Sequence, residues 1–254
     1  MKPAFHDHFS EVARRYADYR PQYPMTLFEY LAAVAPKGAK VWDCAAGTGQ
    51  ATVGLARVFK SIVATDASAE QIAQAQPHEG IEFRVATAEQ SGLADASVGL
   101  VTVAQALHWF DLDRFYAEVR RVLYPGGVLA IWSYGVHRVG DLAIDRIIMD
   151  FYSDIVGPYW PPERAIVEQG YRTIPFPFAE LSPPAFQMET TWTLEQLMGY
   201  FGTWSATQRY IKARGESPLG ALSKALSAVW GEATVERRIH WPLALRVGRL
   251  GEAK

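Results

Sequence analysis

The sequence contains a single cysteine, Cys44, among its 254 residues. No intrachain disulfide can therefore form, and a reducing compartment is the simplest environment for such a chain. No stretch approaches the roughly 20 consecutive apolar residues of a transmembrane helix. The first fifteen residues carry His, Asp and Glu where a secretory signal needs an apolar segment. Together these absences predict a soluble, cytoplasmic protein with no membrane partner.

The chain also lacks a large excess of charge of either sign. Its formal net charge is −2, and hydrophobic and charged residues make up 49% and 20% of it, as in ordinary globular domains. A general nucleic-acid binder would carry a basic excess, so nucleic acid is not expected as a partner. His6 and His8 lie close together, but no further ligand follows at a metal-binding spacing. We therefore expect no metal site.

Residues 37–133 alternate between short apolar runs and segments of helical periodicity. The apolar runs predict strands at 39–44, 61–65, 81–86, 98–103 and 128–132, and the periodic segments predict helices over 50–60, 68–76 and 111–123. Ser68 is a suitable N-cap, and Pro125-Gly126-Gly127 is expected to end the last helix before the fifth strand. This alternation indicates a parallel α/β sheet, in which ligands bind beyond the carboxyl ends of the strands.

The segments on either side of this core differ from it in composition. Residues 1–36 are expected to form an N-terminal helical cap. Residues 134–230 are rich in proline and aromatic residues, and we expect a helical lid and acceptor region with one strand at 186–192. Within this region, 157–185 is expected to be a loop or lid. The C-terminal segment 231–254 is expected to supply an edge strand over 235–247.

The segment VWDCAAGTGQ at 41–50 places Gly47 and Gly49 where the first strand turns into a helix. Glycine permits this tight turn and lets the backbone approach a ligand closely. A dinucleotide site would have a third glycine at the position of Thr52, and Asp43 would repel its pyrophosphate. A cationic ligand avoids this repulsion. S-adenosylmethionine carries an ammonium and a sulfonium and has no phosphate.

Asp43, Gly47 and Gly49, followed by Asp66 after the second strand, resemble the class I S-adenosylmethionine-dependent methyltransferases. Several further motifs resemble one subgroup, the trans-aconitate methyltransferase-like proteins: YRPQYP (19–24), AEQ (88–90), AQALHWFD (104–111), LYPGGVLAIW (123–132), TWSATQRY (203–210) and WPLALRVG (241–248). The resemblance implies a Rossmann-like, doubly wound, mostly parallel seven-stranded sheet with an antiparallel edge strand and a helical lid.

The same resemblance implies which residues contact the cofactor. Asp43 and Gln105 would receive the ammonium, and Asp66 would accept both ribose hydroxyls, since one carboxylate can take several donors. The N–H of Ala88 would face the adenine, and Arg20 would pair with the methionine carboxylate. The residues expected to bind the cofactor are Tyr16, Arg20, Asp43, Ala45, Gly47, Gly49, Asp66, Ala67, Thr87, Ala88, Glu89 and Gln105.

Two positions depart from the family pattern. Many relatives have glycine where this chain has Ala45 and Ala46, and alanine is tolerated there if the local φ is negative. Many also have Asp at the position of Thr87, so that Thr87, Glu89 or water would have to accept a hydrogen bond from the adenine amino group.

The implied reaction is an in-line methyl transfer to a small-molecule acceptor, in which the enzyme holds the reacting atoms at near-attack distance. His108 and Trp109 follow the fourth strand and are the candidate catalytic pair, as base or hydrogen-bond partner and as pocket wall. Relatives of the subgroup methylate small acids at a carboxylate, which calls for cations near the pocket. The candidates for binding the acceptor are Tyr19, Tyr134, His137, Arg138, Trp160 and Arg164.

These candidates also have purely structural explanations. Asp66 could cap the helix that begins near Ser68, and Asp43 could stabilise the N-terminus of the helix that follows it. His108 could likewise be a cap, with Trp109 as a buried anchor for the helix. At the level of function, an NAD(P)-dependent oxidoreductase and a non-catalytic cofactor-binding protein stay open as alternatives.

Overall fold

The computed structural model describes residues 21–251, which form two compact units. Within the described residues, the sheet unit consists of Tyr23–Gly135, Glu163–Met188 and 242–251. The helical unit is formed mainly by Val136–Pro162 and Glu189–Trp241. The segment 163–188, which the sequence places in the lid region, thus belongs to the sheet unit. The candidates Tyr16, Tyr19 and Arg20 lie outside the described residues.

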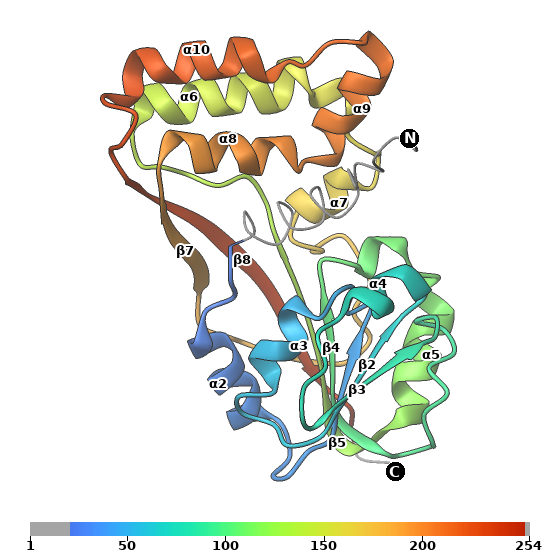
Figure 1. Ribbon diagram of the computed structural model, residues 1–254. Helices are drawn as coiled ribbons and strands as arrows, with labels where there is room; N and C mark the ends of the chain where they lie inside the picture. Colours follow the sequence, from blue (N-terminus) through green and yellow to red (C-terminus); the bar gives the residue numbers. More distant parts are fainter. Residues whose placement is uncertain (1–20, 252–254) are drawn as a thin grey trace, which may run out of the picture. The chain divides into compact units, whose positions relative to one another are not determined.

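The sheet has the strand order β3-β2-β1-β4-β5-β8-β6, and β7 also pairs with β8 (Figure 1). The strands are β1 (Val41–Cys44), β2 (Ile62–Asp66), β3 (Ile81–Val85), β4 (Val98–Ala104), β5 (Leu123–Tyr134), β6 (Ala179–Leu181), β7 (Phe186–Trp192) and β8 (Arg237–Arg249). The first five are parallel, as predicted. The order reverses between β1 and β4, so the carboxyl ends of these two strands mark the expected ligand site.

The helices of the sheet unit are α2 (Met25–Val34), α3 (Gln50–Leu55), α4 (Ala69–Gln74), the 3-10 turn η1 (Leu107–Trp109), α5 (Leu112–Val122) and α7 (Arg164–Glu168). The helices predicted at 50–60, 68–76 and 111–123 are present, but the segment 157–185, predicted to be a loop or lid, contains the short helix α7 and the strand β6. Ser68 caps α4 by accepting a hydrogen bond from the N–H of Gln71 at 3.2 Å, which confirms its predicted role. Asp111 caps α5 in the same way, through the N–H of Arg114 at 3.3 Å.

The start of β5 differs from the prediction. Pro125-Gly126-Gly127 was expected to separate the helix from a strand beginning at Val128, but β5 begins at Leu123 and runs through all three residues. The ladder with β4 shifts register between Val98 and Leu100, and Gly126 adopts φ +80°. The Pro-Gly-Gly segment therefore forms an irregularity within the strand and does not end it. Periodicity alone does not distinguish such a bulge from a turn.

Strand β8 is antiparallel to β5, from the pair Val128–Arg249 to the pair Tyr134–Leu243. Its antiparallel direction agrees with the prediction, and its bounds are shifted by two residues from the expected 235–247. The three-residue β6 pairs with the far end of β8, through Ala179 and Leu181. Strand β7 occupies the predicted residues Phe186–Trp192.

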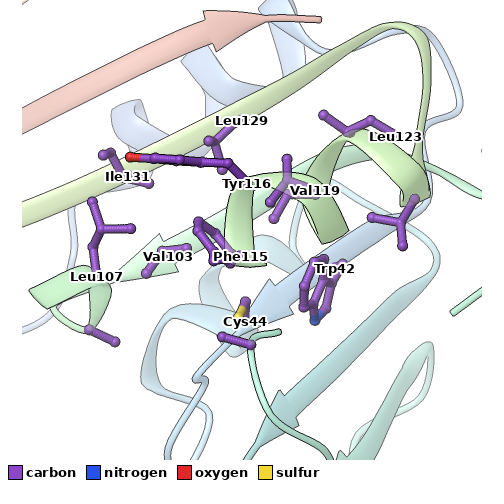
Figure 2. Packing of buried hydrophobic residues seen from close by; sticks show 14 of the residues in the cluster. Trp42, Cys44, Val103, Leu107, Phe115, Tyr116, Val119, Leu123, Leu129 and Ile131 are labelled. Carbon is purple, nitrogen blue, oxygen red and sulfur yellow. The ribbon is translucent and has the colours of Figure 1, made fainter. Parts of the chain in front are cut away.

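One face of the sheet packs against α5 (Figure 2). Trp42 and Cys44 of β1, Val103 of β4 and Phe115 and Val119 of α5 are buried together in this cluster. Because successive strand residues point to opposite faces, Asp43 lies on the other face, where Thr52 of α3 reaches it. Cys44 is therefore a buried core residue, as expected from its neighbour Asp43.

The helical unit is built around an aromatic cluster. Its elements are α6 (Leu142–Asp150), a π-helical turn η2 (Phe151–Ile155), a 3-10 turn η3 (Gly157–Tyr159), α8 (Leu194–Gly202), α9 (Ser205–Arg214) and α10 (Leu219–Trp230). Rings of Tyr200, Phe201, Trp204 and Trp241 pack around one another with centroids 4.9–6.3 Å apart. Among residues 21–251 no helix has the length and apolar character needed to cross a bilayer.

Candidate functional site

The carboxylate of Asp43, next to the carboxyl end of β1, is completely buried. The hydroxyl of Thr52 donates to its Oδ2 at 2.6 Å, and the hydroxyl of Thr102 donates to its Oδ1 at 2.7 Å. Burial raises the pKa of Asp43 to about 6, although both hydroxyls act in the opposite direction. No cation of the described residues forms an ion pair with Asp43, so its negative charge lacks a counterion within this part of the chain.

Neither of the two threonines that hold Asp43 was predicted from the sequence. Thr52 was noted only as the absence of a third glycine, and its hydroxyl instead fixes the carboxylate. Thr102 lies in the middle of β4, a strand that is otherwise apolar and is buried over its first six residues. A lone hydroxyl in such a strand needs a hydrogen-bond partner, and this is the signal that could have identified it.

In the loop after β1, every second residue from Ala45 to Gly49 has a left-handed backbone conformation. Ala45 has φ +54°, Gly47 +58° and Gly49 +91°. The expectation that alanine is accommodated here at negative φ is therefore wrong for Ala45, whereas Ala46 is not in the left-handed region. The φ of Gly49 favours glycine, and a Cβ there would also lie 3.1 Å from Cζ of Phe83, a tight contact that would require the ring to shift.

Asp66, at the end of β2, joins the glycine loop to the segment before α4. Its Oδ2 accepts a hydrogen bond from the N–H of Gly47, and its Oδ1 accepts one from the N–H of Ser68, both at 2.9 Å. The carboxylate is only partly buried and has two further lone pairs that can accept donors. The cap of α4 is Ser68 rather than Asp66. Ala67, between them, is exposed.

The segment after β3 contains the three residues expected near the adenine. Thr87 forms an isolated bridge with Gln90, and Ala88 is buried. Oε1 of Glu89 accepts a hydrogen bond from the N–H of Asp111 at 3.1 Å. This bond connects the segment to the start of α5.

Gln105 follows β4 directly and has φ +61°, a strained conformation for a residue other than glycine. Its N–H donates to the carbonyl oxygen of Trp132 at 2.9 Å, and its Nε2 donates to the carbonyl oxygen of Tyr134 at 3.0 Å. Since the amide nitrogen is directed at β5, the side-chain carbonyl is the group that can accept a donor from a ligand.

The pair His108-Trp109 lies in the turn η1 that follows. Nδ1 of His108 is 3.0 Å from the hydroxyl of Tyr171, and the two rings stack with centroids 6.0 Å apart. Burial, assisted by the positive charge of Arg164, lowers the pKa of His108 to about 4. Trp109 is 59% exposed, so it does not anchor the turn as a buried residue would. Its ring lies against that of His108, with centroids 4.7 Å apart.

Comparison with known proteins identifies the family. Residues 42–131 match the family model described as "Methyltransferase domain". A Dictyostelium discoideum protein, provisionally named a methyltransferase, is 32% identical over 225 residues, 87% of this chain and 86% of that protein. A solved structure from Anaeromyxobacter dehalogenans, provisionally described as a type II methyltransferase, is 45% identical with a TM-score of 0.87 and covers 92% of this chain and 99% of its own.

The chain belongs to the class I S-adenosylmethionine-dependent methyltransferases. It is an enzyme, and S-adenosylmethionine is its methyl donor. The nicotinamide and non-catalytic alternatives are thereby set aside. An uncharacterized methyltransferase of Mycobacterium tuberculosis is also similar, with 36% identity over 135 residues that cover 52% of this chain and 54% of that protein.

The charges around Asp43 and Asp66 fit a cationic cofactor. The buried carboxylate of Asp43 has hydroxyl partners but no counterion among the described residues, and a positive group nearby would favour its ionised form. A pyrophosphate would instead add a like charge beside it. Asp66 has lone pairs available for two hydroxyls, and the left-handed Gly47 carries no side chain that would separate a ligand from the backbone.

The methyltransferase's expected acceptor residues are divided between the two units. Tyr134 and Arg164 belong to the sheet unit, and His137, Arg138 and Trp160 belong to the helical unit. Among the latter, His137 is buried among the rings of the aromatic cluster, with centroid distances of 5.4–6.2 Å to four of them. Burial lowers its pKa to about 3. Arg138 is exposed and pairs through its backbone with His240.

Proposed function

We propose that this methyltransferase transfers the methyl group to a carboxylate oxygen of a small organic acid. The observation that carries the proposal is the environment of His108, next to the end of β4. This imidazole is a weak base, because burial and Arg164 lower its pKa to about 4. A hydroxyl or amine acceptor would need a base at the site, whereas a carboxylate is already ionised and needs none.

At the donor end, the residues on β1, β2 and β4 would hold the cofactor. Asp66 would accept the ribose hydroxyls while keeping its bonds to Gly47 and Ser68. The field of Asp43 and the side-chain carbonyl of Gln105 would favour the ammonium. S-adenosylmethionine, when bound, supplies a methyl group on a positively charged sulfur. The task left to the chain is to orient the acceptor in line with that methyl group.

At the acceptor end, Arg164 supplies positive charge close to His108. Its guanidinium lowers the pKa of the imidazole by more than the neighbouring Glu163 raises it, and its Nε lies 3.7 Å from Oε1 of Glu168, one turn further along α7. A positive charge there favours an anionic acceptor. Tyr134, in the same unit as His108 and Arg164, is a candidate for a further contact with the acid.

The resemblance to the trans-aconitate methyltransferase-like proteins supports the same acceptor class. It rests on motifs that extend from YRPQYP (19–24) to WPLALRVG (241–248) and therefore covers both units. The relatives that cover most of the chain carry names that specify no acceptor, so they neither add to nor conflict with this proposal.

The first experiment is calorimetric titration with S-adenosylmethionine and with S-adenosylhomocysteine. We then expect turnover with a panel of small mono-, di- and tricarboxylic acids, detected as S-adenosylhomocysteine and as a methylated product that alkali hydrolyses. An ether or N-methyl product would resist alkali. Methylation of phenols or amines alone would overturn the carboxylate proposal and leave the family assignment intact.

A pair of arginine variants tests the acceptor end. Arg164→Gln should raise the KM for the acid about tenfold, as expected when a charged hydrogen-bond partner is lost. Arg172→Gln, at an exposed position in the same segment, is the matched control and should leave KM unchanged. Equal KM values for the two variants would remove Arg164 from the proposed site.

A further inference from the structure

Tyr171 is held in an unusual conformation at the turn after α7. Its φ is +59°, which L-residues with a large side chain rarely adopt, and its side chain is completely buried. The preceding Gly170 has φ +60°, and a Cβ there would lie 2.5 Å from Cβ of Ala244. A strained tyrosine persists only where the surrounding structure fixes it, and such strain accumulates at functional sites.

Arg246 of β8 provides this fixation. Its Nη1 donates to the carbonyl oxygens of Tyr171 and Ile174, both at 2.8 Å. Its Nε and Nη2 form a two-point ion pair with the carboxylate of Glu180, at 2.9 and 3.1 Å. Arg246 thus ties the turn to the sheet and fixes the backbone that carries the Tyr171 side chain.

The phenol of Tyr171 contacts the imidazole of His108, whose Nδ1 lies 3.0 Å from the phenol oxygen. Burial raises the pKa of Tyr171 far above its usual range, so the phenol keeps its proton at any ordinary pH. The protonated phenol therefore has an O–H to donate.

The hydrogen bond between the two side chains can run in either direction, and burial decides between them. If Nδ1–H donated to the phenol, the buried O–H would be left without the acceptor that the structure places within reach, which is unfavourable. If the O–H donates to Nδ1, both the phenol and Nδ1 are satisfied. The proton of the neutral imidazole then resides on Nε2, which makes no hydrogen bond within the described residues.

We propose that Tyr171 is a positioning residue that fixes His108 in the Nε2–H tautomer, so that the imidazole presents a hydrogen-bond donor instead of a base. The consequence for catalysis rests on the proposed function: a donor at this place orients an anionic acceptor and has no lone pair with which to deprotonate a neutral one. Arg164 and Glu163 are the charged groups that act on His108, with opposite signs.

Nitrogen NMR of the full-length protein labelled with ¹⁵N in its histidine rings tests the tautomer without any acceptor or cofactor. His108 is assigned from the signal that disappears in His108→Asn. In the wild type at pH 7 we expect Nδ1 to show the shift of an unprotonated, hydrogen-bonded nitrogen and Nε2 that of a protonated one. A protonated Nδ1 would overturn the inference, whatever the protein methylates.

Tyr171→Phe removes only the hydroxyl, and Tyr116→Phe is the matched control. Tyr116 is also buried in the sheet unit, and its hydroxyl donates to the carbonyl oxygen of Pro175 at 2.7 Å, away from His108. We expect the His108 signals of Tyr171→Phe to become those of a tautomer mixture and those of Tyr116→Phe to remain as in the wild type. Unchanged signals in Tyr171→Phe would overturn the inference.

A kinetic comparison adds the catalytic consequence. With an acid found by the panel above, Tyr171→Phe should lower kcat/KM five- to tenfold, the effect of one hydrogen bond, relative to Tyr116→Phe. A changed tautomer with unchanged kcat/KM would show that Tyr171 fixes His108 but that His108 does not contact the acceptor. That outcome would refute the role of His108 in the proposed function and leave the tautomer assignment in place.

Discussion

Replacing Asp43 with asparagine should change how the stability of the cofactor-free enzyme depends on pH. The pKa of Asp43 is about 6 in the folded protein, against 3.8 for an ordinary aspartate. Below pH 3.8 the carboxyl is protonated in both states and contributes no pH dependence. As the pH rises, the unfolded chain loses this proton first, so the folded state loses stability until the pH exceeds about 6.

The size of this loss follows from the separation of the two pKa values. About two pKa units correspond to ~3 kcal/mol of unfolding free energy, an upper estimate for a fully buried group. Asp43→Asn cannot ionise and should not show the loss. Its stability relative to the wild type should therefore rise by ~2.5 kcal/mol between pH 4 and pH 7, whatever constant offset the substitution adds.

Urea unfolding at several pH values between 4 and 8 measures this difference. Groups that titrate in both proteins, such as His108 and His137, cancel in the comparison. Asp113→Asn, at an exposed carboxylate of α5, gives the background for removing a charge. If the stability curves of the wild type and Asp43→Asn run parallel over this range, Asp43 is not a buried, destabilised carboxylate and the electrostatic argument for a cationic cofactor fails.

Three further predictions concern single residues. Asp66→Asn removes one acceptor oxygen and should weaken S-adenosylmethionine binding by about 1.5–3 kcal/mol in calorimetry; undiminished affinity in a folded variant would contradict the assignment. In urea unfolding, the stability of His137→Phe relative to the wild type should increase by ~3 kcal/mol as the pH falls from 7 to 4. The buried imidazole of the wild type has a pKa near 3, so below pH 6.5 the unfolded chain binds a proton that the folded protein does not. Ala45→Gly relieves a left-handed alanine and should raise stability by up to ~1 kcal/mol, whereas the control Ala46→Gly should lower it; equal effects would show that the φ of Ala45 is not strained.

Much of the fold is determined by local features of the sequence. The five parallel strands, the cap at Ser68 and the strand Phe186–Trp192 follow from hydrophobic periodicity and capping chemistry, which act over a few residues. The glycine loop and the acidic residue after β2 are likewise visible as motifs. The same local signals misplaced the start of β5, because a Pro-Gly-Gly segment is compatible with a bulge as well as with a turn.

The sequence by itself therefore determined the family, the cofactor and the order of strands and helices in the core. Only the tertiary structure decided which side chains meet. Thr102 reaches Asp43 across 59 residues, and Tyr171 reaches His108 across 63. It also assigned 163–188 to the sheet unit. Such contacts depend on strand order and on burial of whole elements, and no short-range pattern encodes them, because a hydroxyl or a phenol looks the same in sequence whether or not it has a distant partner.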